Sequence, residues 1–362
     1  MYELPLLGFF LIIFTYMSIR KFINLAPKLK LIDIPNQRSS HKSVTPRGAG
    51  IVFGTTFLIS LFLYYQGEIT PHLLIILSIL IVFIGGVVDD IYTLSSKTKL
   101  AFIVLAAIIA YFDGYTISSI GTYFGYELNL GIIALPFTLF AIIAFTNAVN
   151  LTDGLDGLAS SISIIILAAL LTIGILNNDT MLTVWPALLI CSVLGFLILN
   201  WYPAKVFMGD SGSLLLGFII AILSIKALEY VNPVAIFFLA AVPILDTLVV
   251  FRRRRQRGKS PFEADKNHLH HILDNIKQNK AFTVKMLIFM QLTFSCMFLQ
   301  LYKQDDGLNL LIFFLLFLIF FDLFDPRARK RPKNAKLKKK YKRLKKEKKE
   351  NQKLEKKLEN IS

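Results

Sequence analysis

The chain has 362 residues, of which 55% are hydrophobic and 18% are charged, and its formal net charge is +16. A soluble domain of this size would hold about a quarter charged residues, so the composition excludes an ordinary soluble protein. The charge also argues against nucleic-acid binding because of where it lies. Residues 326–362 hold 18 of the 40 Lys and Arg but only 4 of the 24 Asp and Glu, and the rest of the chain is nearly neutral.

Repeated apolar stretches predict an all-α polytopic integral membrane protein. Each stretch is about 18–22 residues long, which is the length a helix needs to cross about 30 Å of hydrocarbon. We expect about 11 transmembrane helices, at residues 4–25, 48–66, 71–88, 99–118, 130–149, 158–176, 181–199, 212–230, 233–251, 283–302 and 308–325. These helices form one transmembrane domain, residues 1–325, and a basic tail follows at residues 326–362.

The segments between these helices fall into two sets of very different charge. One set comprises residues 26–47, 89–98, 150–157, 200–211, 252–282 and the tail, and it is rich in Lys and Arg. The other set carries one basic residue, Lys303, beside five acidic ones. The positive-inside rule therefore predicts an external N-terminus and a cytoplasmic C-terminus. All the polar motifs below fall on the cytoplasmic side.

The first cytoplasmic loop contains Arg38, His41 and Arg47, and Gly48-Ala49-Gly50 follows. Arginine can bind two phosphate oxygens at once, and glycine allows close approach of the backbone to a ligand. A basic loop after the first helix would also satisfy the positive-inside rule without any function. This loop is therefore a weak signal for phosphate binding.

The third predicted helix ends in two adjacent carboxylates, Asp89 and Asp90, and Lys97 and Lys99 follow. Neighbouring carboxylates repel each other unless a cation or a shared proton lies between them. The C-terminal end of a helix is also unfavourable for acidic residues. We therefore favour a functional role for this pair over a solvated helix terminus.

Asn147, Asn150, Asp153 and Asp156 stand at the end of the fifth predicted helix and just after it, at intervals of three residues. If the segment is helical, Asn147, Asn150 and Asp153 lie near one face. A glycine-rich turn with asparagine alone would be an ordinary helix end, but here Asp-Gly occurs twice within five residues. Carboxylates suit a hard cation and amides suit hydrogen bonds, so the segment indicates an anionic, metal-bridged substrate.

Asn200 and Asp210 flank the loop before the eighth predicted helix. Asp210 stands where that helix begins, so it could be an ordinary N-cap residue. The same helix end could instead orient Asp210 and nearby N–H groups towards a cation and a phosphate.

Three of the five histidines, His268, His270 and His271, lie within four positions of the longest cytoplasmic loop. A zinc site could use such spacing, but no cysteine is near, because Cys191 and Cys296 both fall inside apolar stretches. Imidazole groups that contact phosphate fit the surrounding motifs better, and a buried structural role is disfavoured.

Together these motifs resemble those of the polyprenyl-phosphate N-acetylhexosamine-1-phosphate transferases. The resemblance covers residues 30–275 and rests on Asp89-Asp90, Asn147–Ala159, Gly209–Ser213 and His268–His271. The chain has Gly-Ala-Gly where three glycines are usual, and His-Leu-His-His in place of three consecutive histidines. The histidine cluster, together with Pro46-Arg47-Gly48, resembles the WecA/TagO-like branch rather than the related MraY branch, and Ala49 is a small departure from the three glycines usual in the former.

The resemblance implies a reaction at the bacterial cell membrane. A UDP-N-acetylhexosamine, with GlcNAc favoured, would donate its sugar-1-phosphate to undecaprenyl phosphate, release UMP and start a lipid-linked cell-envelope polysaccharide. The alternatives are a UDP-N-acetyl-6-deoxyhexose of the FucNAc or QuiNAc type, or a UDP-MurNAc-pentapeptide donor. The sequence does not name the final polymer. Protomers of this family often pair, so the resemblance allows a homodimer, and the sequence leaves the oligomeric state open.

The resemblance also assigns roles to individual residues. Asp210 would bind Mg²⁺, with Mn²⁺ as a substitute. The catalytic residues would be Asp89, Asp90, Asp153, Asp156, His268, His270 and His271. The substrate-binding residues would be Arg38, His41, Arg47, Lys97, Lys99, Asn147, Asn150 and Asn200. Within this set, Asp89 and Asp90 would lie beside the acceptor phosphate or the metal, and the histidines beside the diphosphate and sugar.

The chemistry of the reaction agrees with these residue types. Two anions must meet, so a divalent cation and basic residues are needed to offset their repulsion. A phosphate monoester has its second pKa near about 6, so the acceptor is largely dianionic at neutral pH. We therefore favour direct attack by the lipid phosphate, with Asp89 positioning it or removing a residual proton. A covalent aspartyl intermediate is the alternative.

Two interpretations without catalysis compete with this one. A secondary transporter for an anionic substrate would gather its polar residues near the bilayer midplane, whereas here they lie at helix ends on one side. A scaffold anchored through the basic tail would leave the carboxylates unexplained.

In the basic tail, Leu337, Tyr341 and Leu344 share a helical stripe, which is typical of a helix on anionic lipid headgroups. A solvated charge run is the alternative reading of the tail.

Overall fold

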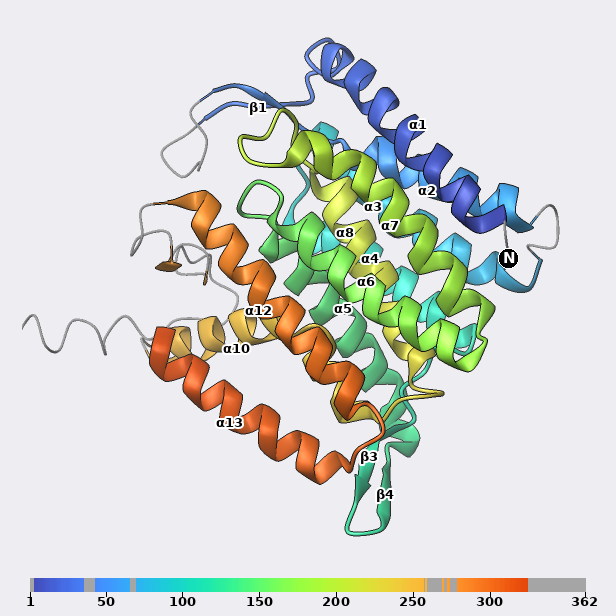
Figure 1. Ribbon diagram of the computed structural model, residues 1–362, viewed down its shortest axis with the longest axis vertical. Coiled ribbons are helices and arrows are strands. Elements are labelled where there is room, and N and C mark those ends of the chain that lie inside the picture. Colours follow the sequence, from blue (N-terminus) through green and yellow to red (C-terminus); the bar gives the residue numbers. More distant parts are fainter. Residues whose placement is uncertain are drawn as a thin grey trace, which may run out of the picture. The chain divides into compact units, whose positions relative to one another are not determined.

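Helices occupy nearly every apolar stretch in the computed structural model, which describes residues 3–35, 43–65, 70–256, 258, 269, 272–273 and 279–324. The long helices are α1 (Glu3–Leu25), α2 (Gly50–Tyr65), α3 (Leu73–Tyr92), α4 (Ser96–Phe112), α5 (Ala134–Thr152), α6 (Leu158–Asn177), α7 (Thr180–Asn200), α8 (Asp210–Ala227), α10 (Ala241–Gln256), α12 (Lys280–Leu301) and α13 (Asp306–Phe324). Short helical turns are η1 (Thr70–His72), η2 (Gly131–Ile133), η3 (Pro233–Ala235) and α9 (Ile236–Leu239). Figure 1 shows their arrangement.

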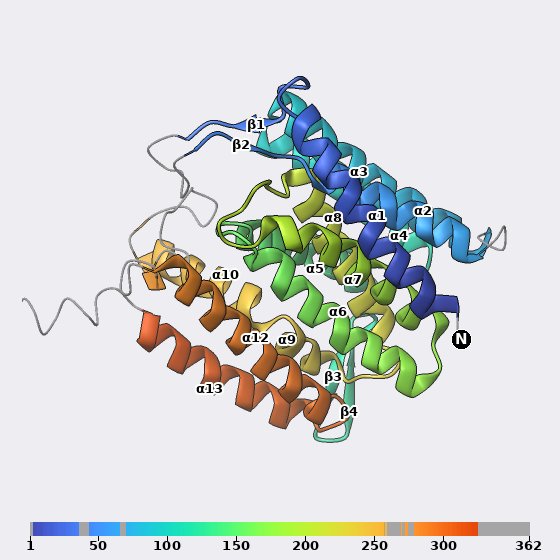
Figure 2. The same ribbon diagram turned by 45° about the horizontal axis from the view of Figure 1, so that its top comes forward.

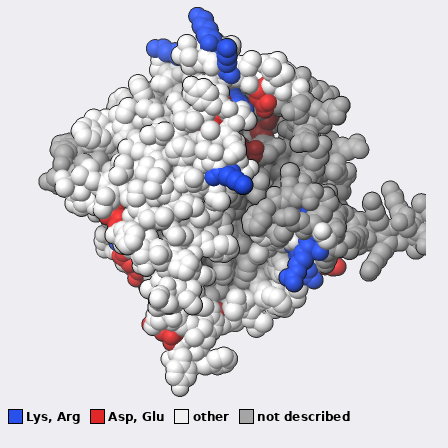
Figure 3. Space-filling model, turned by 180° about the vertical axis from the view of Figure 1, so that it is seen from behind, with Lys and Arg blue, Asp and Glu red and all other residues white. Residues whose placement is uncertain are grey.

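The helices confirm a polytopic membrane protein. Within the described residues, eight helices are long and apolar enough to cross a membrane, and a bent pair makes a ninth candidate. The predicted second and fourth spans correspond to the shorter helices α2 and α4, which have 16 and 17 residues. Most of the described surface in Figure 3 carries neither basic nor acidic side chains, as a lipid-facing surface requires. The count of eleven spans and their orientation remain predictions.

The ninth predicted span, residues 233–251, is not one continuous helix. It bends by 91° between the segment ending at Leu239 and the helix α10. The buried side chain of Gln291 on α12 bridges this break: its Nε2 donates to the carbonyl of Leu239 (2.7 Å), and its Oε1 accepts from the N–H of Val242 (3.2 Å). Because unpaired backbone groups are costly in a membrane, this side chain supplies the partners that the break removes.

Helix α8 forms the centre of the helical bundle. It packs against α2, α3, α5 and α6, and Figure 2 shows it enclosed by them. All its side chains are buried except those of Asp210 and Lys226, near its two ends. An apolar helix with neighbours on all sides has no solvated face. Polar groups therefore gather at the two ends of α8, and a cavity among the described residues lies at each end.

Two small antiparallel ribbons interrupt the helices, which the all-α prediction left out. In the first, β1 (Ile32–Asp33) pairs with β2 (Thr45–Pro46), so the two sides of the first loop lie together. In the second, β3 (Ser119–Tyr123) pairs with β4 (Tyr126–Asn129) between α4 and α5. The carboxylate of Asp306 accepts from the N–H of Thr122 (2.9 Å) and so ties β3 to the start of α13.

The chain divides into two compact units, Met1–Phe313 and Phe314–Ser362. The first unit contains everything described in the following sections. Of the second unit the structure describes only the last part of α13, an apolar helical segment that ends at Phe324. The predicted boundary between residues 325 and 326, and the basic tail, lie outside the described residues and stay predictions.

Candidate functional site

A cavity of about 260 Å³ lies where the end of α3, the turn after α5 and the beginning of α8 meet. Most of its charged lining consists of residues predicted from the sequence. The lining residues are Asp33, Arg47, Asp89, Asp90, Asp153, Gly154, Leu155, Asp156, Asn200, Phe207, Gly209 and Asp210. Six carboxylates and one guanidinium around such a small space form an unusually charged site for a protein this apolar.

Asp89 and Asp210 share a single cation, Lys99. The Nζ of Lys99 lies 2.8 Å from Oδ2 of Asp89 and also bonds Oδ2 of Asp210. The other oxygen of Asp89 accepts the N–H of Leu94 (2.6 Å), in the turn between α3 and α4. The sequence required a cation near the carboxylates at the end of α3, and Lys99 supplies one.

Asp90 has a different partner from Asp89, although the two are adjacent. Its two carboxylate oxygens accept the N–H groups of Asp210 (2.9 Å) and Ser211 (3.0 Å), the first two residues of α8. Asp90 therefore caps α8 from another helix and offsets the positive end of its dipole. The N-cap alternative for Asp210 was wrong: Gly209 holds that position, and Asp210 is the first helical residue.

The segment before α2 fixes the loop that leads into α8. The N–H of Phe207 donates to the carbonyl of Pro46 (2.8 Å), and the N–H of Gly50 donates to the carbonyl of Met208 (2.8 Å). Between these bonds, Arg47 donates from Nη2 to the carbonyl of Asp90 (2.8 Å). Its Nε is buried and has no partner among the described residues. A guanidinium with a spare donor at a cavity is suited to bind a phosphate oxygen.

Of the two predicted asparagines on α5, only Asn150 reaches this cluster. Its Nδ2 donates to Ser213 Oγ (2.7 Å) and to Asp210 Oδ1 (3.3 Å). Asn147 instead donates to the carbonyl of Ile143 in its own helix (2.8 Å). The substrate-binding role expected for Asn147 stays a prediction. Both asparagines are on α5, three residues apart, but only Asn150 bonds to residues of α8.

Asp156 and Asn200 connect the turn after α5 to the loop after α7. Oδ2 of Asp156 accepts the N–H of Ala204 (3.0 Å). Oδ1 of Asn200 accepts the N–H of Gly157 (3.0 Å), and its Nδ2 donates to the carbonyl of Val206 (3.0 Å). Asn200 is buried, and these bonds occupy both ends of its amide. In this structure it holds the two segments together.

Asp153 lies in the turn between α5 and α6, with no hydrogen-bond partner among those found in the described residues. Burial, and then the nearby carboxylates of Asp210, Asp90 and Asp156, raise the pKa of Asp153 to about 7. A carboxyl group with such a pKa gains a charge near neutral pH and is then repelled by its neighbours. Any cation that enters the cavity would relieve this repulsion.

Replacing Asp153 by Asn should remove this pH dependence from stability. An acid whose folded-state pKa exceeds its unfolded-state value binds protons more tightly when folded, so wild-type stability falls as pH rises from about 4 to about 7. In EDTA, the Asp153→Asn protein should therefore gain a few degrees in Tm over wild type between pH 5 and pH 8. Thermal unfolding in detergent measures this, with the exposed Glu127→Gln as control. A Tm difference that is constant with pH would contradict the prediction.

The donor set at this cavity fits a hard cation. Carboxylate oxygens are what Mg²⁺ prefers, and Asp89, Asp90, Asp153, Asp156 and Asp210 all line the cavity. Within the described part of the chain, however, no three His, Cys, Asp or Glu side chains already surround a common point suited to a metal. Mg²⁺ commonly binds through one or two carboxylates and keeps several waters, so such a cage is not required.

Several predicted site residues lie away from the cavity or beyond the described ranges. Lys97 is exposed and does not line the cavity. Five predicted residues lie outside the described residues: Arg38, His41, His268, His270 and His271. Between these histidines, Leu269 is described, and its N–H donates to the buried carboxylate of Asp246 on α10 (2.7 Å).

Three residues of the site had no role predicted from the sequence: Asp33, Ser213 and Asp246. Asp33 lines the cavity because β1 pairs with β2, and two-residue strands leave no periodic pattern in the sequence. Ser213 accepts from Asn150, and Asp246 anchors Leu269. A carboxylate inside an apolar span is itself a signal of function, and this signal could have identified Asp246.

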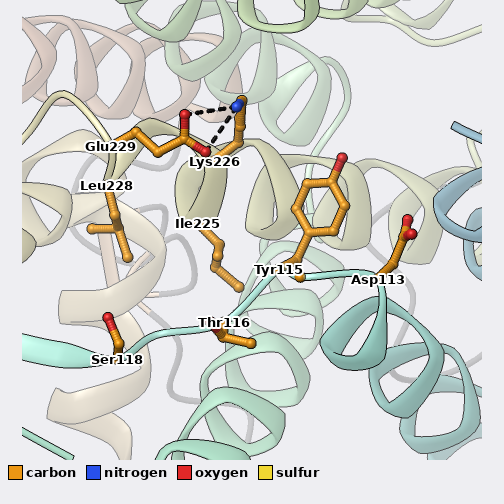
Figure 4. A pocket seen from close by; sticks show the side chains of 9 residues that line it. Asp113, Tyr115, Thr116, Ser118, Ile225, Lys226, Leu228 and Glu229 are labelled. Carbon is orange, nitrogen blue, oxygen red and sulfur yellow. Dashed lines mark hydrogen bonds and ion pairs between the residues drawn. The ribbon is translucent and has the colours of Figure 1, made fainter. Parts of the chain in front are cut away.

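A larger cavity, of about 470 Å³, lies at the opposite end of α8. Figure 4 shows Lys226 and Glu229 bonded to each other, with Asp113 and Tyr115 across the space. Both Nζ contacts of Lys226 with Glu229 are 2.7 Å, and Asp179 lies 3.5 Å from the same Nζ. Charges here are largely paired, whereas the smaller cavity gathers carboxylates in excess. The smaller cavity is therefore the candidate active site.

Comparison with known proteins connects this site to a family. Residues 72–228 match the model of glycosyl transferase family 4. A Bacillus subtilis protein described as a probable undecaprenyl-phosphate N-acetylglucosaminyl 1-phosphate transferase is 33% identical over 301 residues, 81% of this chain and 83% of the relative. The undecaprenyl-phosphate alpha-N-acetylglucosaminyl 1-phosphate transferase of Escherichia coli K12 is 32% identical over 68% of this chain and 70% of its own length. That of Yersinia pestis is 34% identical over the same shares.

Proposed function

The chain belongs to the undecaprenyl-phosphate N-acetylglucosaminyl 1-phosphate transferase family, and we propose that it transfers GlcNAc-1-phosphate from UDP-GlcNAc to undecaprenyl phosphate. UMP is released, and the lipid-linked product starts a cell-envelope polysaccharide. The observation that carries this proposal is the carboxylate-lined cavity with Arg47 at the ends of apolar helices. Such a cavity can receive a charged nucleotide sugar from water and a lipid phosphate from the bilayer.

Some residues of the site are suited to position the substrates, and others to hold the cation that offsets their charge. Arg47, with a buried Nε to spare, is suited to a phosphate oxygen of either substrate. Asp89 is held by Leu94 and Lys99, which suits it to position the acceptor phosphate or accept its residual proton. We propose that Asp210, with Asp153 and Asp156 near it, holds Mg²⁺ or Mn²⁺. When bound, that cation would offset the negative charge of the diphosphate.

A direct assay tests the function. The purified chain in detergent is given radiolabelled UDP-GlcNAc, undecaprenyl phosphate and Mg²⁺, and labelled lipid is extracted into organic solvent. Using purified protein keeps host enzymes from contributing. We expect labelled lipid from UDP-GlcNAc, and UDP-N-acetyl-6-deoxyhexose and UDP-MurNAc-pentapeptide, each radiolabelled and supplied in turn, should give labelled lipid only if that donor is the true one. Absence of lipid product with all of these donors would refute the proposal.

We also propose that the candidate active site faces the cytoplasm, with the N-terminus outside and the C-terminus inside. Two observations support this orientation: the basic residues gather in the loops at the same end as the cavity, and the loops of the other set carry one basic residue, Lys303. Contact of the basic tail with anionic lipid, and a homodimer, remain proposals from the sequence.

Cysteine labelling should reveal this orientation. In a variant lacking Cys191 and Cys296, a cysteine at exposed Ser96, near the candidate site, should react with a membrane-impermeant maleimide only after the cells are permeabilised. A cysteine at Phe124, the exposed tip of the β3–β4 hairpin, should react in intact cells. The opposite pattern would reverse the orientation.

A further inference from the structure

The position between Asp89 and Asp210 is held by a side chain of the protein itself. Lys99 on α4 places its ammonium 2.8 Å from Asp89 Oδ2 and in contact with Asp210 Oδ2. Each carboxylate has a second partner on its other oxygen, the N–H of Leu94 for Asp89 and the amide of Asn150 for Asp210. Both carboxylates therefore remain oriented whether or not Lys99 is present.

A divalent cation held by Asp210 would bind at or beside its Oδ2, and Oδ2 of Asp89 next to it is a further oxygen of the kind that such a cation prefers. A cation at Asp210 and the ammonium of Lys99 would lie within a few ångströms of each other, and like charges at that distance repel strongly. The side chain of Lys99 is partly exposed and ends a flexible four-carbon stem. Lys99 can therefore move away, whereas Asp89, near the end of α3, and Asp210, at the start of α8, are fixed to helices.

We propose that Lys99 and the divalent cation compete for Asp89 and Asp210, so that cation binding releases the Lys99 ammonium to contact a substrate phosphate. Without the cation, Lys99 offsets the repulsion between the two carboxylates and keeps the site folded. With it, the released ammonium adds positive charge where the two phosphate groups must meet. The inference rests on the proposed function, because that function supplies the cation and the phosphates.

Thermal unfolding at increasing Mg²⁺ tests the competition without measuring catalysis. In Lys99→Met, which keeps the apolar stem, Tm in EDTA should fall below that of wild type. Mg²⁺ should then raise Tm with a half-saturating concentration about tenfold lower than in wild type, because a charge-assisted bond to the competitor is lost. Lys226→Met is the matched control. Lys226 also bridges two carboxylates, Glu229 and Asp179, but at the other end of α8, so its loss should leave the Mg²⁺ midpoint unchanged.

The outcomes separate this inference from the proposed function. Equal Mg²⁺ midpoints in wild type and Lys99→Met would overturn the competition and leave the proposed function standing. If neither Mg²⁺ nor Mn²⁺ changes the Tm of any variant, both the competition and the metal site fail. A catalytically active protein would then retain the transferase function without that site.

A second measurement uses the wild-type protein, so it does not depend on whether Lys99→Met folds. An amine-modifying reagent is applied with and without Mg²⁺, and modification of Lys99 is quantified by peptide mass spectrometry against the exposed Lys205. An ammonium released from its carboxylates should be modified several-fold faster, while Lys205 is unaffected. Unchanged or slower modification of Lys99 in Mg²⁺ would overturn the proposal.

Discussion

Asp210→Asn is expected to lower the rate of lipid product formation by about 10²- to 10³-fold, the range found when a group that stabilises transition-state charge is removed. The substitution keeps the size of the side chain but removes its negative charge, and with it the proposed cation ligand. The backbone N–H of residue 210 can still donate to Asp90, so the first turn of α8 is retained. The loss should therefore appear in activity and not in folding.

The assay of transfer to undecaprenyl phosphate measures this effect, beside thermal unfolding of the same preparations. Asp113→Asn is the matched control, because Asp113 is a carboxylate that lines the cavity at the opposite end of the bundle. It should transfer at nearly the wild-type rate. An Asp210→Asn protein that keeps more than about a tenth of wild-type activity would exclude Asp210 from the role assigned to it here.

Gly86→Ala should lower activity by about 10²-fold, although residue 86 touches no substrate, because a displacement of about 1 Å can have that effect on a reacting group. A Cβ at Gly86 of α3 would lie 2.6 Å from the carbonyl oxygen of Asp210 and 2.6 Å from Cα of Ser211. These are backbone atoms, so they cannot rotate away. Helix α2 also packs closely against α8, since a Cβ at Gly50 of α2 would lie 2.1 Å from the backbone N of Gly212.

The neighbouring Gly85 provides the matched control for this prediction. A Cβ there would lie 2.7 Å from Cγ and 2.9 Å from Cβ of Phe102 on α4, so α4 and not α8 would have to shift. Both Gly85→Ala and Gly86→Ala should therefore lose about 1–3 kcal/mol of stability through overpacking, but Gly85→Ala should keep more activity because it leaves α8 in place. Equal activity in the two variants would show that α8 is not held in place through Gly86.

The helical architecture was largely predictable from the sequence because its signal is local. An apolar stretch of sufficient length must pair its backbone groups within itself when it lies in a bilayer, and this requirement does not depend on its neighbours. The break near Ala240 escaped prediction for the opposite reason. It is stabilised by Gln291, a residue on another helix about 50 positions away, so residues 233–251 look like any other apolar stretch.

The candidate site was predicted in its composition but not in its connections. The sequence identified Asp89, Asp90 and Asp210 as unusual because charges at the ends of membrane helices are costly without a purpose. It grouped Asp89 with Asp90, however, since they are adjacent in the chain. In the structure the two carboxylates serve different partners, Lys99 and the start of α8. Adjacent residues on a helix point in directions about 100° apart, which the motif alone does not convey.

By itself, the sequence determined that this protein lies in a membrane and which family its motifs resemble, and it predicted that the polar motifs lie at one end of its helices. Composition, the length of apolar stretches and motif spacing are properties of short segments, so they can be recognised before the fold is known. Only the tertiary structure decided that Asp90 caps α8 across 120 positions, and that Lys99 bridges to Asp210 across 111. Those contacts depend on how α3, α4 and α8 pack, and packing is a property of the whole bundle.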